Sequence, residues 1–322
     1  MPDLRLVGWE VRVAMTRTCF PYPGGKSQYA AWIVSSLPAH SCYVEAFGGS
    51  GAVFFNKEPS QIEVYNDLDG DIPHFFRVLR DDGEDLQEYL RQVEFSKDLY
   101  EQWTRRWYEG WRPSDDVKRA AVFYFSRYAQ WGGKYEGISG FARSASGRDK
   151  AKTWRKKVED LEDFQERLND QAPGEWPPDF VDFKDRARGV LIDNLDYREL
   201  FEKYDADNSD GEGTFFYCDP PYVDTEHRYS GDGFDHEAFI DALLDLEGDW
   251  LVSYGTEVPE RLQSFRTESE EATRGIDRVS SNGKAAHERL IKSYPKHRER
   301  SFEIGGTSGN ALDKNWGEED ED

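Results

Sequence analysis

The segment that most constrains the fold lies at residues 215–222, where a short apolar run stops at an acid, two prolines and a tyrosine. The run is rich in aromatic residues and contains no glycine or proline, which predicts a buried strand. Asp219 follows at the strand end, the edge where open α/β sheets bind their ligands. Pro220 and Pro221 have fixed φ angles and no N–H group, so this stiff turn presents carbonyl oxygens, and Tyr222 adds a flat ring. Such acceptors beside a ring suit a planar substrate with an exocyclic amino group, such as a flipped-out nucleobase.

The region before residue 86 alternates strand and helix signals. Residues 42–47 predict a strand, a glycine turn follows at 48–51, and residues 52–55 predict the start of a helix. A second strand is predicted at 63–65 and ends at Asn66-Asp67. The next apolar residues share one face of a helix: Ile72, Phe75, Phe76 and Leu79. This β-α-β order is typical of nucleotide-binding domains and predicts an α/β fold.

Residues 86–185 contain no convincing strand, but they carry two apolar stripes with helical spacing. One stripe consists of Val117, Ala121, Tyr124, Tyr128 and Trp131, and the other of Ala151, Trp154, Val158, Leu161 and Leu168. The α/β pattern then resumes, with strands predicted at 190–192, 250–254 and 288–293 and helices at 197–204 and 235–246. We therefore predict a cofactor-binding half at 19–85, a helical insertion at 86–186, a catalytic half at 187–316 and an acidic tail at 317–322.

The charge of the chain is strongly negative but unevenly distributed. The formal net charge is −23, yet residues 97–157 contain fifteen Lys or Arg against seven Asp or Glu. That stretch is therefore +8 and the remainder is −31. A basic stretch in an acidic protein is hard to attribute to solubility and favours a polyanionic partner such as DNA. The acidic remainder is typical of halophilic proteins, since the Debye length falls to ~3 Å at 1 M salt.

Cysteine usage and the lack of long apolar runs indicate a cytoplasmic protein. Cys19, Cys42 and Cys218 do not have paired metal-ligand spacing, so no metal site is predicted, and few cysteines suit a reducing compartment. No apolar run approaches the ~20 residues of a membrane span, and the N-terminus lacks the features of a signal peptide. Met15 is an alternative start, because the recognisable pattern begins just after it. We expect a monomer.

Two glycine-containing segments are candidates for a cofactor site. The turn Phe47-Gly48-Gly49-Ser50-Gly51 lets the backbone approach a ligand closely and opens onto a helix N-terminus. Phe54 stands where the dinucleotide fingerprint has its third glycine, which counts against NAD or FAD. Asp67 lies close to the ~20-residue spacing expected of a ribose ligand, although an acid there could instead cap a helix. The second segment, Phe20 to Lys26, contains Gly24-Gly25 but lacks the Walker spacing.

Taken in order, these segments resemble the Dam-like family of DNA adenine-N6 methyltransferases, the D12 class or alpha group. The matching pieces are Tyr22 to Lys26, Glu45 to Gly51, Asn66-Asp67, and Tyr217 to Tyr222. Asn282-Gly283-Lys284, followed by Glu288 to Ile291, is similar to the closing segment of the family. The resemblance covers about residues 19–294. It implies a Rossmann-like, S-adenosylmethionine-dependent methyltransferase sheet with an inserted, mainly helical target-recognition domain.

The resemblance also assigns roles to individual residues. It implies that Tyr22 stacks on the cofactor adenine, that Lys26 lies near cofactor and target, and that Asp67 binds the ribose. It makes Asp219 the acid that meets the target amino group near the methionine end of the cofactor. The implied cofactor-binding residues are Tyr22, Gly25, Lys26, Glu45, Phe47, Gly49, Gly51, Asp67, Asp196 and Asp219, and the implied catalytic residues are Asp219, Pro220, Pro221 and Tyr222.

The amino nitrogen of adenine is a poor nucleophile because its lone pair is delocalised into the ring. Acceptors at Asp219 and at the carbonyl of Pro220 would take both N–H hydrogen bonds and leave the lone pair directed at the sulfonium methyl group. Positioning and electrostatics then carry the rate without a covalent intermediate. Tyr222 would stack on the extruded base. Cys218 is expected to be a buried, inert cysteine, because it faces the opposite side of its strand.

Candidate DNA contacts lie in and near the insertion. The segment from Phe123 to Arg148 shares only the general plan of the recognition segments of the best-known Dam sequences, so a GATC target is not implied. The basic residues expected to contact phosphates or bases are Arg127, Lys134, Arg143, Arg148, Lys150, Lys152 and Lys284. Residues 224–235, which follow the catalytic turn, are a candidate flexible segment that could close over the site.

Other functions stay open at the level of sequence. Some RNA guanine-N2 methyltransferases carry a similar Asp-Pro-Pro-Tyr, so an RNA amino-methyltransferase is the main alternative. A catalytically inactive DNA-binding protein or an acidic DNA mimic is a second, although the intact Asp219 to Tyr222 turn and the basic stretch argue against it. The residues do not separate adenine N6 from cytosine N4, and they do not reveal the recognition sequence or a restriction endonuclease partner.

Overall fold

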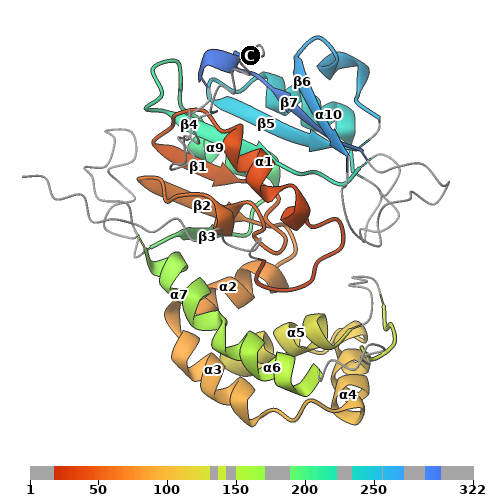
Figure 1. Cartoon of the computed structure of the whole chain (residues 1–322). Coiled ribbons are helices and arrows are strands. Elements are labelled where there is room, and N and C mark those ends of the chain that lie inside the picture. The colour runs from red at the N-terminus through yellow and green to blue at the C-terminus, as the bar shows by residue number, and fades with distance from the viewer. Residues whose placement is uncertain are drawn as a thin grey trace, which may run out of the picture.

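A seven-stranded sheet forms the centre of the protein (Figure 1). The structure is a computed structural model and describes residues 18–130, 137–142, 150–170, 189–222, 234–255, 257–271 and 287–298. The strands are β1 (Cys42–Glu45), β2 (Ile62–Asn66), β3 (Leu191–Asp193), β4 (Thr214–Cys218), β5 (Asp249–Tyr254), β6 (Arg266–Glu271) and β7 (His287–Lys292). The α-helices are α1 (Ala30–Ser35), α2 (Asp71–Asp81), α3 (Gly83–Gln92), α4 (Lys97–Tyr108), α5 (Asp116–Ala129), α6 (Lys150–Glu159), α7 (Leu161–Asn169), α9 (Tyr197–Tyr204) and α10 (His236–Leu244). Short 3-10 helices are η1 (Lys26–Gln28), η2 (Phe54–Asn56), η6 (Glu260–Leu262) and η8 (Lys296–Arg298).

The strand order is β3-β2-β1-β4-β5-β7-β6. The five strands β3, β2, β1, β4 and β5 run parallel to one another. Strand β7 lies between β5 and β6 and is antiparallel to both. The chain order reverses between β1 and β4, and the register pairs Glu45 with Tyr217 at the end of both strands. Open α/β sheets bind ligands at such a switch point. The sheet confirms the predicted Rossmann-like α/β fold and places the glycine turn beside the Asp-Pro-Pro-Tyr turn.

Alternating residues of the central strands are buried on opposite faces of the sheet. Phe215 and Tyr217 of β4 join an apolar cluster that includes residues of α1, α2 and α5. Phe216 and Cys218 join a second cluster with residues of α9 and α10. All five residues of β4 are buried, as expected for a parallel strand covered by helices on both faces.

The segment between β2 and β3 is mainly helical in its described part. Figure 1 shows α3, α4, α5 and α6 gathered below the sheet, reached from β2 through α2 and connected back toward β3 through α7. The helices pack through aromatic rings. The ring centre of Trp154 of α6 lies 5.4–5.7 Å from the ring centres of Tyr124, Phe125 and Tyr128 of α5. The boundaries of the predicted domains stay predictions. In the part of the chain that the structure describes, no helix has the length and apolar character needed to cross a membrane.

A buried ion-pair network joins α7 to the sheet. Glu63 of β2 accepts hydrogen bonds from the Nζ of Lys57 at 2.5 Å and from both terminal nitrogens of Arg167 at 2.5 and 2.7 Å. Burial raises the pKa of this carboxyl, but Lys57 and Arg167 outweigh that effect and the net pKa is lowered. Because a buried carboxylate without these cations would be costly, the network holds the returning helix against β2.

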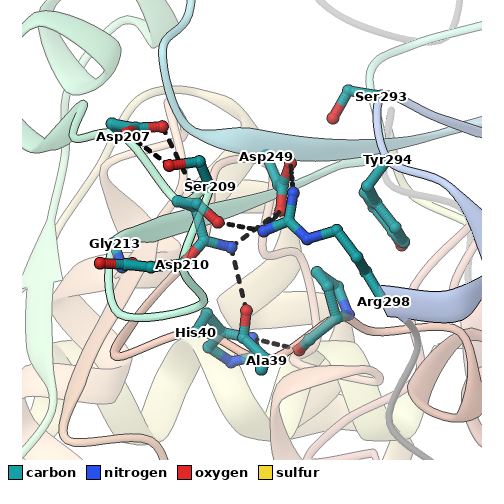
Figure 2. A network of polar contacts seen from close by, with 12 residues as sticks. Ala39, His40, Asp207, Ser209, Asp210, Gly213, Asp249, Ser293, Tyr294 and Arg298 are labelled. Atoms are coloured by element: carbon teal, nitrogen blue, oxygen red, sulfur yellow. Dashed lines mark hydrogen bonds and ion pairs between the residues drawn. The ribbon is translucent and has the colours of Figure 1, made fainter.

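A second polar network lies at the N-terminal ends of β4 and β5, on the side of the sheet opposite the C-terminal ends of β1 and β4. The guanidinium of Arg298 makes a bidentate pair with Asp249, at 3.0 and 2.8 Å (Figure 2). Asn208 donates to Asp249 at 2.8 Å and to the carbonyl of Ala39 at 2.9 Å. The loop before β4 and the end of the described chain are therefore tied together far from the ligand edge.

Two local predictions are wrong, and one strand was not predicted. Residues 52–55 do not begin a long helix, since only the short η2 forms there. The second apolar stripe is divided between α6 and α7, and the pattern could not show the break because Trp154, Leu161 and Leu168 all face the core. Strand β6 has the polar sequence RTESEE and pairs only with β7, so it lacks the apolar alternation that reveals a strand.

Candidate active site

The loop after β1 depends on glycine. Gly49 and Gly51 have φ angles of +54° and +71°, which side chains other than glycine rarely adopt. A Cβ on Gly48 would lie 2.3 Å from the ring of Tyr65. The hydroxyl of Tyr65 donates to the carbonyl of Gly49. Tyr65 thus supports the loop from below, and the loop backbone can approach a ligand from above.

Asp67 lies against this loop at the end of β2. Its carboxylate accepts hydrogen bonds from the N–H of Gly49 at 2.8 Å and from the N–H of Asp69 at 2.9 Å. Burial raises the pKa of Asp67 to about 7, against the lowering effect of these two backbone hydrogen bonds. The N-cap of α2 is Gly70, so the alternative in which Asp67 caps a helix is wrong.

Tyr22 covers the other side of the loop. Its nearest ring atom is 3.0 Å from the position that a Cβ of Gly49 would occupy. The N–H of Gly25 donates to the carbonyl of Tyr22 at 3.2 Å, which closes the turn before Lys26. The structure therefore brings together Tyr22, Gly49 and Asp67, three of the residues that the resemblance assigns to the cofactor.

Phe47 and Asp196 lie at the neighbouring strand ends. The ring of Phe47 packs 6.3 Å from that of Tyr197 and 5.7 Å from that of Phe239. Asp196 caps α9, where its carboxylate accepts from the N–H of Arg198 at 3.0 Å. The preceding residue, Leu195, is tied to the side chain of Asn66 at 2.8 Å. Asp196 therefore has a structural task at the helix start, at the same edge of the sheet as Asp67.

The catalytic turn carries a cluster of charged and aromatic side chains. The Nζ of Lys26 lies 2.8 Å from Asp219 and 3.8 Å from Glu288, and 4.8 Å from the centre of the Tyr222 ring. The hydroxyl of Tyr222 donates to Glu288 at 2.5 Å. Burial raises the pKa of Asp219, and the Lys26 ammonium opposes this rise. Pro220 is buried and Pro221 is half-buried beside them.

Two residues expected to contact the cofactor or DNA have buried side chains. Glu45 is only 1% exposed and accepts a hydrogen bond from Tyr43, and its role in cofactor binding stays a prediction. Arg127 is 4% exposed, and its guanidinium donates to the hydroxyl of Tyr108 at 2.7 Å. The Arg127 side chain is thus held in the interior, and its contact with DNA stays a prediction. In both cases the residue type was informative, but the direction of the side chain was not visible in the sequence.

For most of the residues expected to contact DNA, the structure does not describe the side chain. Lys134, Arg143, Arg148 and Lys284 lie outside the described residues, as do residues 224–233 of the candidate segment after the catalytic turn. Lys150 and Lys152 belong to α6, but their side chains are not described. Cys218 is buried as predicted, and burial raises the pKa of its thiol, which makes it a poor nucleophile.

Two residues at the site were not identified from the sequence. Glu288 belongs to the closing segment of the resemblance but had no role there, because nothing local places it near Tyr222. Asn66 donates to the carbonyls of Ala46 and Leu195 at 2.9 and 3.1 Å, and so ties together the loops after β1 and β3. The signal for Asn66 was its place beside Asp67 at a strand end.

Comparisons with known proteins agree with this geometry. A family profile described as D12 class N6 adenine-specific DNA methyltransferase matches residues 22–174, a range that starts at Tyr22 and includes the glycine loop and Asp67. The chain is also similar to the Type II methyltransferase M1.LlaDCHI of Lactococcus lactis subsp. cremoris, with 26% identity over 294 residues. That alignment covers 85% of this chain and 94% of the relative.

Proposed function

Because a D12 class profile matches residues 22–174, we propose that this chain is an N6 adenine-specific DNA methyltransferase of that class. It would transfer a methyl group from S-adenosylmethionine directly to N6 of an adenine extruded from duplex DNA at a specific sequence. The observation that supports this most strongly is the placement of Asp219, Lys26 and Tyr222 at the same edge of the sheet as the glycine loop. The glycine-loop side of this edge suits the nucleoside part of a cofactor, and the side with the Asp219 turn suits a base with an amino group.

The residues on the loop side fit the cofactor. S-adenosylmethionine supplies an electrophilic methyl group on a sulfonium centre. The backbone at Gly49 and Gly51 permits close contact, the ring of Tyr22 can stack on the adenine, and Asp67 can accept hydrogen bonds from ribose hydroxyls. Each carboxylate oxygen of Asp67 has a second lone pair for this purpose beside its backbone donor.

The residues on the other side fit the target base. The carboxylate of Asp219 and the carbonyl of Pro220 accept the two amino hydrogens, which directs the nitrogen lone pair at the methyl group. Burial raises the pKa of Asp219, and Lys26, at 2.8 Å, opposes this rise and so favours the ionised form of the acceptor. The ring of Tyr222 stacks on the base and holds it in line. Orientation and fixed charges then carry the reaction.

The basic stretch of residues 97–157 supports DNA as the partner, through phosphate contacts outside the reacting centre. The name of the relative, a Type II methyltransferase, supports a restriction–modification system in which this enzyme protects the sites cut by a partner endonuclease. Cysteine usage and the acidic composition support a cytoplasmic enzyme of a salt-adapted organism. We propose that it acts as a monomer.

Substitution of the catalytic acid tests the proposal. Asp219→Ala should lower methyl transfer by about 100-fold or more, because the main acceptor for the amino group is lost, while DNA affinity changes by less than about threefold. Transfer would be measured by mass spectrometry of nucleosides from treated DNA. Asp207→Ala is the matched control, since Asp207 is exposed and bonds to Ser209 at the opposite edge of the sheet.

The same assay separates the alternatives. N6-methyladenine in DNA supports the proposal, whereas N4-methylcytosine or methylated guanine in structured RNA would replace it. Undiminished transfer by Asp219→Ala would refute the mechanism. Sequencing of the methylated positions then identifies the recognition sequence, and the assay is run at low and high salt because phosphate contacts weaken with ionic strength.

A further inference from the structure

Glu288 is a buried carboxyl that meets the catalytic turn from a distant part of the chain. It lies on β7, next to β5 in the sheet, and is 5% exposed. Its Oε1 accepts the hydroxyl proton of Tyr222 at 2.5 Å and lies 3.8 Å from the Nζ of Lys26. The residues of the catalytic turn, of η1 and of β7 therefore converge on one point.

The hydroxyl of Tyr222 is within reach of two carboxyl groups. It donates to Glu288, and a hydrogen bond from the same hydroxyl also lowers the pKa of Asp219. A phenol has a single proton, so it can satisfy only one acceptor fully at a time. If Glu288 were absent, the proton would turn to Asp219 and compete with the amino group of the target base for that oxygen.

The ring of Tyr222 also needs a fixed direction. One face packs on Tyr254, with ring centres 6.3 Å apart and planes at 30°, and a Cβ added at Gly255 would lie 3.2 Å from the ring. These contacts limit the tilt of the ring, but the hydrogen bond at its far end determines where the hydroxyl points. A ring that stacks on a base must hold its plane, because a small tilt moves the amino group away from the methyl donor.

We propose that Glu288 is a positioning residue for methyl transfer: it holds the Tyr222 hydroxyl, which fixes the stacking ring and leaves Asp219 available for the target amino group. Glu288 also offers Lys26 a second negative neighbour, so Lys26 can stay in place when the base engages Asp219. The inference rests on the proposed function and adds to it a residue on β7. The charged and titratable groups that face Glu288 are Lys26, Asp219 and Tyr222.

Three variants and a double variant test the proposal in the full-length protein, on a duplex carrying the mapped recognition sequence. Glu288→Ala should lower kcat by about 10- to 100-fold, with the KM for S-adenosylmethionine within about threefold of wild type, because the hydrogen bond that fixes the Tyr222 ring is lost on the base side alone. Glu288→Gln should recover kcat to within about fivefold, since the amide oxygen accepts the same hydrogen bond. Tyr222→Phe should resemble Glu288→Ala, and combining the two should add less than about twofold.

A spectroscopic measurement separates positioning from general damage. With 2-aminopurine at the target position, fluorescence reports how the extruded base stacks. Glu288→Ala should alter the emission of the bound duplex, and Glu288→Gln should restore it. Glu268→Gln is the matched control, because it makes the same chemical change on the neighbouring strand β6, where Glu268 binds Lys292. That control should leave kcat and the fluorescence unchanged.

The outcomes distinguish this proposal from the proposed function. A wild-type protein that does not methylate DNA would refute the function itself. If wild type is active and Asp219→Ala is not, a normal kcat in Glu288→Ala, or fully additive losses in the double variant, would overturn the role of Glu288 alone. Should Glu288→Ala fail to fold, Glu288→Gln is compared in the wild-type and Tyr222→Phe backgrounds, and a loss that persists without the hydroxyl contradicts the proposal.

Discussion

Replacement of Glu45 by glutamine should make the protein more stable at neutral pH. The carboxyl is 1% exposed beneath the cofactor loop and accepts the hydroxyl of Tyr43 at 2.8 Å. Burial raises the pKa of Glu45 from its ordinary 4.5 to about 8, against the opposing effects of Tyr43 and Lys57. A glutamine side chain at this position would have the shape of the protonated acid and its hydrogen-bond acceptor, but it would never ionise.

The direction of the effect follows from proton linkage. Since the pKa is higher in the folded state, the folded protein binds more protons between the two pKa values. The stabilisation is therefore complete below the unfolded pKa of 4.5 and is lost as the pH rises toward the folded pKa of about 8. With 1.36 kcal/mol for each tenfold change, wild type should lose about 3 kcal/mol relative to Glu45→Gln between about pH 5 and pH 7.5.

The assay is urea unfolding at constant salt, followed by the fluorescence of the ten tryptophans at several pH values. The free energy of unfolding of Glu45→Gln minus that of wild type should grow by about 3 kcal/mol over this range. Glu199→Gln, on the exposed side of α9, is the control and should show no such trend. A constant difference would refute the buried titration. A large loss of S-adenosylmethionine affinity in Glu45→Gln would instead indicate that Glu45 contacts the cofactor directly.

Two further predictions concern the sheet and the loop. Glu63→Gln should lower the free energy of unfolding by about 3–5 kcal/mol, because buried cations including Arg167 lose their partner. Since the folded pKa of Glu63 is depressed, the gap from wild type should narrow as the pH falls through the lowered pKa, and a loss below about 1 kcal/mol at neutral pH would contradict the network. Gly48→Ala should weaken S-adenosylmethionine binding at least about tenfold in calorimetry, because the new Cβ would meet the Tyr65 ring at 2.3 Å and displace it. Gly140→Ala, with nothing within 4 Å of its Cβ, should bind normally, and equal affinities for both variants would refute the steric argument.

Much of the fold could be predicted because burial leaves a direct mark on sequence. The helix predicted at 197–204 is α9 over the same residues, since Leu200, Phe201 and Tyr204 repeat with helical spacing and Asp196 caps the start. Strands β1, β2, β4 and β5 are short apolar runs because helices cover both faces of the sheet. Strand β6 was not predicted, because a polar edge strand depends on pairing with a strand elsewhere in the chain and not on its own apolar pattern.

At the site, the predictable part was local in sequence. Consecutive residues decide that a glycine loop follows β1, that an acid ends β2, and that a stiff acceptor turn follows β4. Buried side chains were harder to predict, because their direction depends on packing. Arg127 has the chemistry of a DNA contact, yet α5 turns it inward toward Tyr108.

The sequence by itself therefore determined the chemical groups of this enzyme and the strand ends that carry them. Only the tertiary structure decided which of these groups meet. Lys26, Asp219 and Glu288 are far apart in the chain, and they converge because the strand order β1-β4-β5-β7 brings their elements to one edge of the sheet. The burial that raises the pKa of Glu288 to about 7 arises from the same convergence. Contacts between distant segments and the exclusion of water are properties of the packed chain, and no short stretch of residues contains them.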